Sequence, residues 1–281
     1  VHTHNIMGLG FLLPRLLKKM GLRHVHTVHD VQLLEPSGLM MVAGGVPWYV
    51  RIGRWKYRTV MRWIFGSPNV VIFPSQFLCA LYTRYGFFSK SKKVVLHNPA
   101  PIINAGPRTL AKSQQLRFLF VGQLEAHKGI RELLSAWSQW HRRGDAVLEI
   151  VGGGSLENIV CAAALVDKSI LFHGKKNRQE IFFYYNRATF VVFPSLVIEN
   201  APTVIVESFL CGVPVIAAAT GGVPEFVQDA RTGFLYEPES VEGLVAGLDR
   251  AVASMEKWGE MSERAYDMGM KIAEEKHVEK L

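Results

Sequence analysis

Residues 195–225 of the chain are SLVIENAPTVIVESFLCGVPVIAAATGGVPE, and an apolar run at 189–194 precedes them. The apolar run predicts a buried strand. Pro202 fits the first position of a following helix, where its missing N–H has no intrahelical partner to lose, and Gly212 would end that helix. The apolar segment 214–218 predicts the next strand. A strand, a helix and a second strand in this order are typical of a parallel α/β sheet.

Two glutamates eight positions apart, Glu199 and Glu207, give this segment its candidate chemistry. Glu199 is predicted on the loop at the carboxyl end of the first strand, where ligands bind in open parallel sheets. Glu207 is about two helical turns further, roughly 12 Å by the helical rise, so the two carboxylates can hold two hydroxyl-rich parts of one long ligand. The helix-start N–H groups of Thr203 and Val204 suit a phosphate. Two solvated surface glutamates are the alternative at this point.

The sequence around the two glutamates resembles the family 4 glycosyltransferases of the GT-B fold. The pattern E-x7-E is preceded by P-S at 194–195 and followed by C-G-V-P-V-I-A at 211–217 and G-G-V-P-E at 221–225. A second match is F-V-G-Q-L-x-x-x-K-G at 120–129, which resembles the family's G-R-L-x-x-x-K-G. In the family, the arginine and lysine of that motif grip the diphosphate of the donor.

Lys128 matches the motif's lysine, and it lies near a predicted helix start, where its charge and the helix-end N–H groups favour a diphosphate. Gln123 stands where the family usually has arginine. This departure removes one cation from the leaving group, so phosphate binding is expected to be weaker or to be helped by another residue.

The resemblance implies a set of donor-binding residues. They are Gly122, Gln123, Lys128, Gly153, Asn200, Ala201, Pro202, Thr203, Val204 and Glu207. Within this set Glu207 would hold the ribose hydroxyls, Gly153 belongs to a glycine turn beside the nucleoside, and backbone at 200–204 would support sugar and phosphate. Glu199 would contact the sugar hydroxyls and the reacting face.

Histidines in the first thirty residues are the other candidates. T-V-H-D at 27–30 resembles the family's strand-end histidine near the transferred sugar, which implies a catalytic role for His29. The H-x-H at 2–4 corresponds to a family segment near the acceptor, which places His4 and Asn5 on the acceptor side. A structural role is the alternative for each histidine. Because no third ligand is nearby, no metal site is predicted.

Composition bounds the class of protein. The chain has 281 residues, of which 49% are hydrophobic and 20% charged, enough for roughly two globular domains. No apolar run reaches the ~18 residues of a membrane-spanning helix, and no signal peptide pattern is present. The three cysteines are widely spaced, which suggests neither a disulfide framework nor a zinc site, and a reducing cytoplasm is expected.

Basic residues are concentrated in the first part of the chain. Residues 1–108 hold 14 Lys and Arg against two acidic residues, a net charge of +12, whereas residues 109–281 carry a net charge of −4. The segment 48–65 interleaves arginines and a lysine with tryptophans and tyrosines, which is typical of a helix lying in a membrane interface. A core-facing helix with a solvated basic face is the alternative. Nucleic acid is not expected as a partner, since no RNA- or DNA-binding motif accompanies the basic residues.

Strands alternate with helices throughout the second half, which predicts a doubly wound parallel sheet. The expected fold class is therefore α/β of the GT-B type, with two Rossmann-like domains. They are an incomplete first domain at 1–108 on the acceptor side and a nucleotide-sugar-binding domain at 109–281, whose last helix is expected to cross back. The chain begins at Val1 and lacks the family's glycine-rich N-terminal loop, so a fragment or processed chain is expected.

The function expected from the resemblance is a retaining glycosyltransferase. It would move a hexose-type sugar from a nucleotide-sugar donor to a lipid-linked or cell-envelope glycan, without a metal or other cofactor, in the cytoplasm or at the inner face of the membrane. A nucleotide-sugar-binding module without transferase activity and a GT-B nucleotide-sugar epimerase are the alternatives. The donor base, the sugar and the acceptor are left open.

Overall fold

The computed structural model describes residues 1–6, 9–41, 46–99, 106–108 and 115–274. The contacts divide the chain into two compact units, Val1–Asn98 with Val197–Ala201, and Pro99–Leu196 with Pro202–Glu274. Most of the expected linker at 100–115 lies outside the described residues. So does the chain after residue 274, where the crossing to the first domain was expected.

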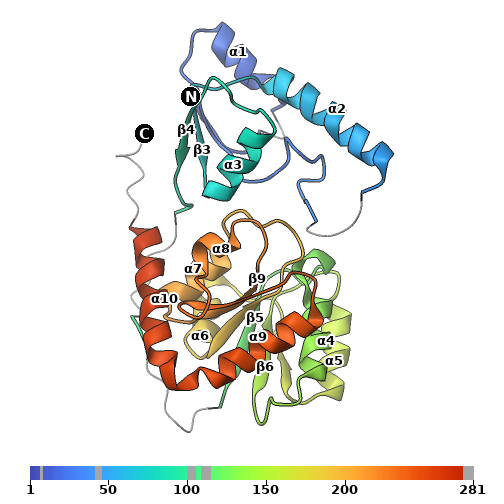
Figure 1. Ribbon diagram of the computed structural model, residues 1–281, viewed down its shortest axis with the longest axis vertical. Helices are drawn as coiled ribbons and strands as arrows, with labels where there is room; N and C mark the ends of the chain where they lie inside the picture. The colour runs from blue at the N-terminus through green and yellow to red at the C-terminus, as the bar shows by residue number, and fades with distance from the viewer. Residues whose placement is uncertain (7–8, 42–45, 100–105, 109–114, 275–281) are drawn as a thin grey trace. The chain divides into compact units, whose positions relative to one another are not determined.

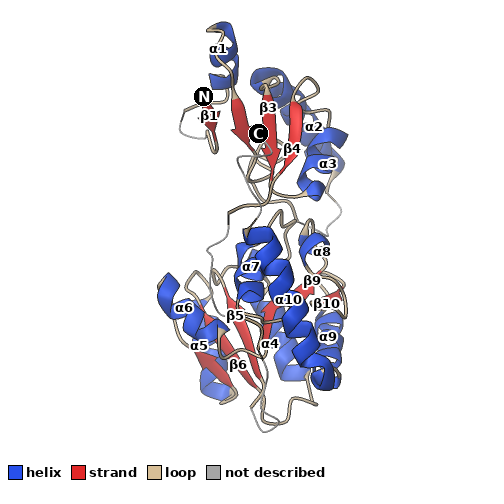
Figure 2. Cartoon of the chain, turned by 90° about the vertical axis from the view of Figure 1, so that its left-hand side faces the viewer, coloured by secondary structure: helices blue, strands red, loops and turns tan. Residues whose placement is uncertain are grey.

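The first unit contains a four-stranded parallel sheet in the order β1-β2-β3-β4. Its strands are β1 (His2–Thr3), β2 (Val25–Thr27), β3 (Val70–Phe73) and β4 (Lys92–Val95). Its helices are α1 (Leu13–Lys19), α2 (Trp48–Phe65) and α3 (Gln76–Arg84). Phe65, Phe73 and Phe88 pack edge to face or tilted in the core, at centroid distances of 5.6–6.1 Å. The helices flank the sheet in Figures 1 and 2.

The second unit is a six-stranded parallel sheet in the order β10-β9-β8-β5-β6-β7. The strands are β5 (Arg117–Val121), β6 (Val147–Val151), β7 (Ile170–Phe172), β8 (Phe190–Phe193), β9 (Val215–Ala218) and β10 (Gly233–Tyr236). Counted from β5, the order is the 3-2-1-4-5-6 order of a dinucleotide-binding sheet. The predicted doubly wound parallel sheet is therefore confirmed.

Helices cover both faces of this second sheet (Figures 1 and 2). They are η1 (Ala126–Lys128), α4 (Ile130–Gln139), α5 (Glu157–Val166), α6 (Arg178–Tyr185), α7 (Thr203–Leu210), α8 (Val223–Phe226), α9 (Val241–Ala253), η2 (Met255–Lys257) and α10 (Trp258–Ala273). α4 packs against α9, and α7 packs against α10. At the second contact an added Cβ on Gly269 would lie 2.8 Å from the Leu210 nitrogen, so the two backbones approach closely.

The structure corrects one local expectation and adds one helix that was not expected. Pro202 is the residue before the first helical residue of α7, not the first residue itself. The sequence also gave no prediction for α5, because its apolar residues do not keep to one face and only Val160 is buried. The predicted α7, its end at Gly212 with φ +63°, and the flanking strands β8 and β9 are confirmed.

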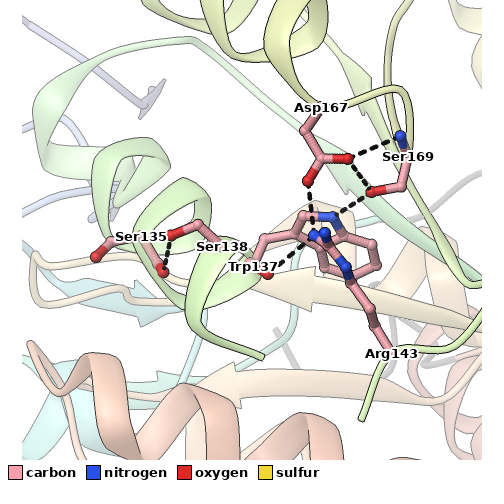
Figure 3. Close-up of polar contacts among 6 residues, drawn as sticks. All are labelled: Ser135, Trp137, Ser138, Arg143, Asp167 and Ser169. Carbon is pink, nitrogen blue, oxygen red and sulfur yellow. Dashed lines mark hydrogen bonds and ion pairs between the residues drawn. The ribbon is translucent and has the colours of Figure 1, made fainter. Parts of the chain in front are cut away.

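A polar network holds the sheet edge where β6 and β7 begin (Figure 3). Arg143 forms an ion pair with Asp167 at 2.6 Å, and Ser169 donates through its backbone N–H and its hydroxyl to the other carboxylate oxygen. The indole N–H of Trp137 donates to the Ser169 hydroxyl at 2.9 Å. These contacts tie the end of α4 to the loop before β7. They lie at the amino ends of the strands, opposite the carboxyl ends.

A buried ion pair crosses the centre of the second sheet. Arg117 on β5 pairs with Glu149 on β6, whose side chain is only 2% exposed, and Arg117 also donates to Gln115 at 2.9 Å. Replacing Arg117 with leucine would leave a carboxylate buried without its cation, and we expect unfolding in urea to show a loss of about 3–5 kcal/mol.

Two variants control this prediction. The double variant R117L/E149L removes both charges, and we expect it to recover most of the lost stability. R264L breaks the exposed pair with Glu260, which should change the free energy of unfolding by about 1 kcal/mol or less. A loss in R117L no larger than that in R264L would contradict the assigned role of the buried pair.

Candidate functional site

The carboxyl ends of β5 and β8 form the switch point of the second sheet. The two strands are neighbours, and from them the sheet extends in opposite directions. In sheets of this order ligands bind in the crevice outside the carboxyl ends of the strands at this point. The Leu196 N–H donates to the His127 carbonyl at 3.0 Å and joins the two loops. An added Cβ on Gly129 would lie 1.8 Å from the Pro194 oxygen. This packing fixes the walls of the crevice.

A pocket of about 600 Å³ opens beside this crevice, at the ends of β5 and β6. Its lining residues are Val121, Gly122, Gln123, Val151, Gly152, Gly153, Gly154, Glu157, Lys175, Lys176 and Ile181. Three predicted donor residues, Gly122, Gln123 and Gly153, are thus brought together. Gly152 has φ +154°, and a Cβ there would lie 1.8 Å from the Gly122 oxygen, so glycine is required where the two loops meet.

Hydrogen bonds hold the pocket's loops in place. The Leu124 N–H donates to the Gly153 carbonyl at 3.0 Å. Ser155 donates to Glu125 through its backbone N–H at 2.9 Å and through its hydroxyl at 2.6 Å. These hydroxyl and amide bonds lower the pKa of Glu125, so it stays an ionised acceptor at neutral pH. The glycine-rich wall is therefore a fixed backbone surface.

Two lysines that line the pocket were not among the site residues predicted from the sequence. Lys175 and Lys176 follow β7 and line the same pocket as Gln123. Lys176 makes a long contact of 3.8 Å with the half-exposed Glu180. A Lys-Lys pair directly after a predicted strand was the available signal, because the ends of parallel strands meet at one sheet edge. These two cations therefore share a pocket with Gln123, the residue that stands where the family's motif has arginine.

Glu207 projects from the middle of α7 and is 17% exposed. The hydroxyl of Tyr185, a fully buried residue of α6, donates to Glu207 Oε2 at 3.3 Å, and Arg178 lies 3.6 Å from Oε1. Burial raises the pKa of Glu207, with Arg178 and the tyrosine hydrogen bond opposing the rise. Sequence reasoning missed both partners, since they precede Glu207 by a helix and a strand and no motif marks them.

The other predicted donor residues occupy the two switch-point loops. Lys128 is half-buried at the end of η1, directly before α4. Thr203 and Val204 lie in the first turn of α7, where helix-start N–H groups lack intrahelical acceptors. Residues 197–201, which include Glu199 and Ala201, group with the first unit. Within that unit the Asn200 side-chain amide donates to the His29 carbonyl at 3.0 Å.

Histidines cluster at the ends of β1 and β2 in the first unit. His4 Nδ1 lies 2.8 Å from His29 Nε2, and the two rings stack with centroids 5.1 Å apart. A small hollow of about 30 Å³ is lined by both rings and by Asn5. The structure therefore brings these three residues together, and their roles stay predictions.

The same cluster holds histidines that the sequence did not connect. The Thr3 hydroxyl bonds His24 at 2.7 Å and His26 at 2.9 Å, and His2 bonds the Thr27 hydroxyl at 2.8 Å. Burial, followed by the charges of the neighbouring histidines, lowers the pKa of His26 to about 3. We call His2, His4, His24, His26 and His29 the histidine cluster. Among the described residues no group of His, Cys, Asp and Glu is arranged to hold a metal ion.

Comparison with known proteins assigns the chain to a family. Residues 105–268, more than half of the chain, match the family described as Glycosyl transferases group 1, and residues 1–102 match Glycosyltransferase Family 4. The chain belongs to the group 1 glycosyltransferases. The family that the motifs at 120–129 and 195–225 resemble is thereby confirmed.

Two curated relatives of this glycosyltransferase chain match over similar lengths. An uncharacterized glycosyltransferase of Haemophilus influenzae is 30% identical over 198 residues, covering 68% of this chain and 54% of that protein. The lipopolysaccharide 1,2-N-acetylglucosaminetransferase of Salmonella typhimurium is 29% identical over 210 residues, covering 66% of this chain and 54% of that protein. The chain spans about half the length of these relatives.

Solved structures share the fold. Sucrose-phosphate synthase of Thermosynechococcus elongatus superposes with a TM-score of 0.74 at 20% identity, over 96% of this chain and 68% of that chain. Anabaena HepE in complex with UDP superposes with a TM-score of 0.73 at 18% identity, over 96% of this chain and 74% of that chain. The expected GT-B fold is confirmed.

Gly129 allows a direct test of the switch-point packing. Alanine there would combine a positive φ of +72° with a Cβ overlapping the Pro194 oxygen, so we expect G129A to lose at least about 3 kcal/mol in urea unfolding. G174A is the matched control, because Gly174 has φ +68° and nothing within 4 Å of an added Cβ. It should lose only about 1 kcal/mol. Equal losses would show that the loop contact contributes nothing.

Glu207 allows a test by pH. The pKa of Glu207 is raised in the folded chain above its ordinary value of 4.5. At pH values above 4.5 the folded chain therefore binds more protons at this site than the unfolded chain does. The fold then loses stability as the pH rises through the folded pKa, because Glu207 ionises. We expect E207Q to melt at a higher temperature than the parent near pH 7, with the difference closing toward pH 4. Scanning calorimetry across this range measures it.

Asp167 provides a control of opposite sign. Burial opposes ionisation there, but hydrogen bonds from Ser169 and Arg143 outweigh it and lower the pKa. D167N should therefore melt at a lower temperature than the parent near pH 7, and this difference should also close in acid. A lower melting temperature for E207Q at neutral pH would mean that ionised Glu207 stabilises the unliganded fold.

Proposed function

We propose that this chain is part of a retaining glycosyltransferase that moves a hexose-type sugar from a nucleotide-sugar donor to a lipid-linked or cell-envelope glycan. The observation that carries the proposal is the pocket at the carboxyl ends of β5 and β6. It is lined by Gly122, Gly152, Gly153 and Gly154 together with Lys175 and Lys176. Fixed backbone and two cations at a sheet edge are suited to a nucleoside diphosphate.

For the donor we propose a uridine diphosphate sugar. Support comes from Anabaena HepE, a fold neighbour solved with UDP and with UDP-glucose. Gly122 and Gly153 let the ligand approach the backbone closely, and Glu207 would accept hydrogen bonds from the ribose hydroxyls. The Tyr185 hydroxyl, held by burial, keeps one oxygen of Glu207 in place while the other is left to the exposed Arg178 or to the ligand.

The chemical step breaks the bond from the anomeric carbon to the diphosphate oxygen. Charge that develops on the leaving group would be stabilised by Lys128 and by the helix-start N–H groups of Thr203 and Val204, an electrostatic contribution. We propose that Lys175 and Lys176 supply the positive charge that Gln123 does not. For Glu199 and His29 we propose contact with the transferred sugar, as the family resemblance implies.

For the acceptor we propose a lipid-linked or cell-envelope glycan, reached by a chain bound at the inner face of the membrane. The lipopolysaccharide N-acetylglucosaminetransferase of Salmonella typhimurium, at 29% identity, supports this class. The net charge of +12 on residues 1–108 agrees with an anionic surface near the acceptor. Among the described residues no helix is long and apolar enough to cross a bilayer.

Calorimetric titration with UDP, GDP and ADP tests the donor site. We expect UDP to bind, and E207Q and K175A/K176A each to weaken it by about tenfold or more, because a charge-assisted hydrogen bond contributes about 1.5–3 kcal/mol. E263Q, on the exposed face of α10, is the control and should bind like the parent. Binding that is equal in all four proteins would contradict the assigned pocket.

Product analysis tests the reaction class. Incubation of the full-length protein with UDP-hexose and a membrane glycan extract should yield a glycosylated acceptor with the anomeric configuration of the donor. Conversion of the donor to its epimer would replace the proposal with a nucleotide-sugar epimerase. Nucleotide binding without any turnover would replace it with a binding module.

A further inference from the structure

The outward face of α2 carries a stripe of exposed apolar side chains. Trp48, Ile52, Trp55 and Trp63 recur at spacings that place them on one side of the helix. Their exposed fractions are 72%, 45%, 65% and 66%. The first three residues and Arg51 border a hollow of about 340 Å³. Tryptophan exposed to this extent signals an interaction surface when such residues gather in one place.

Basic side chains flank the stripe. Arg51 and Lys56 are exposed, and α2 has no acidic residue to pair with them. Arg62 is also exposed, but it donates to the Tyr85 carbonyl at 3.5 Å. The inward basic residues have partners instead: Arg54 pairs with Glu35, and Arg58 donates to the Leu34 carbonyl at 2.9 Å. The helix therefore separates structural arginines from cations that face outward beside tryptophan.

A second stripe lies on and beside α1. Leu9, Leu12, Leu16 and Met20 follow at spacings of three and four, and their exposed fractions run from 53% to 73%. The guanidinium of Arg15 lies 4.0 Å from the centre of the Trp63 ring and donates to the Trp63 carbonyl, which joins the two helices. Figure 1 shows α1 beside the end of α2. We call the two stripes and their flanking cations the α1–α2 surface.

The distribution of exposed apolar residues singles out this surface. Of the 17 large apolar side chains that are exposed among the described residues, ten lie at residues 9–20 or 48–63. Only Leu165, Val166 and Phe183 lie in the second unit. The concentration is therefore a property of one face of the first unit rather than of the whole chain.

We infer that the α1–α2 surface binds an anionic lipid bilayer, with α1 and α2 lying in the plane of the headgroups. Tryptophan rings favour the headgroup level, the leucines can enter the acyl boundary, and the flanking cations are attracted by anionic lipids. The leucine stripe of α1 offers a phosphate backbone no partner, which favours a bilayer over nucleic acid. This inference deepens the membrane location in the proposed function and rests on it.

Vesicle flotation tests the inference with the chain as it stands. We expect the parent to float with vesicles of phosphatidylcholine and phosphatidylglycerol and to bind pure phosphatidylcholine at least tenfold more weakly. W48S/I52S/W55S should lose at least tenfold in binding to the anionic vesicles. L165S/V166S/F183S is the matched control, because it removes three exposed apolar side chains from the second unit, and it should bind like the parent.

A charge-reversal pair separates the electrostatic part. R51E/K56E should weaken binding to anionic vesicles by about tenfold or more, since each basic residue near such a surface contributes about 1 kcal/mol. R142E/K168E reverses two exposed charges of the second unit and should bind like the parent. Equal binding of all variants, or equal binding to both kinds of vesicle, would overturn the inference. The inference would also be overturned if the α2 variants lost binding to a single-stranded oligonucleotide while their flotation with vesicles stayed unchanged.

UDP titration of the same variants keeps the two proposals distinguishable. W48S/I52S/W55S changes only exposed residues of the first unit, and we expect it to bind UDP as the parent does, which also shows that it is folded. Flotation without UDP binding in the parent would contradict the donor site alone. UDP binding without flotation would overturn the membrane surface alone.

Discussion

The close approach of the two switch-point loops is the constraint on which the geometry of the switch point depends. Gly129 and Pro194 touch so closely that no side chain fits between them, and the backbone bond from Leu196 to His127 keeps the loops in register. Lys128 is next to this contact, and α7 begins at Thr203. Gly129 permits the close approach of the two loops, and the proposed role of its neighbour Lys128 is to bring positive charge to the same place.

Sequence periodicity was sufficient for most of the fold. The apolar runs at 189–194 and 214–218 predicted the buried strands β8 and β9, and Pro202 and Gly212 located α7 to within one residue. The exception, α5, shows the limit of the method. Its ten residues are mostly apolar, yet most of them are exposed or half-buried, so no amphipathic pattern marks the helix. Its contact with β7 is visible only in the structure.

The candidate site was predictable where a motif is contiguous and unpredictable where side chains meet through the fold. Gly122, Gln123 and Gly153 were identified because two glycine-containing turns resemble the family's, and the structure places all three around one pocket. Tyr185 bonds Glu207 across 22 positions, and Lys175 reaches the pocket from a third strand. The tyrosine contact has no local signature, because it depends on which elements lie side by side. The lysine pair after β7 is visible in the sequence, but its place in this pocket depends on the order of the strands.

The histidine cluster makes the first unit a proton-linked structure. Burial, ahead of all other causes, lowers the pKa of His2, His24, His26 and His29, so these imidazoles are harder to protonate in the folded unit than in the unfolded chain. An unfolded chain would take up protons at these positions below about pH 6.5. Proton uptake at these histidines is therefore coupled to unfolding, and acidification lowers the stability of the fold around them.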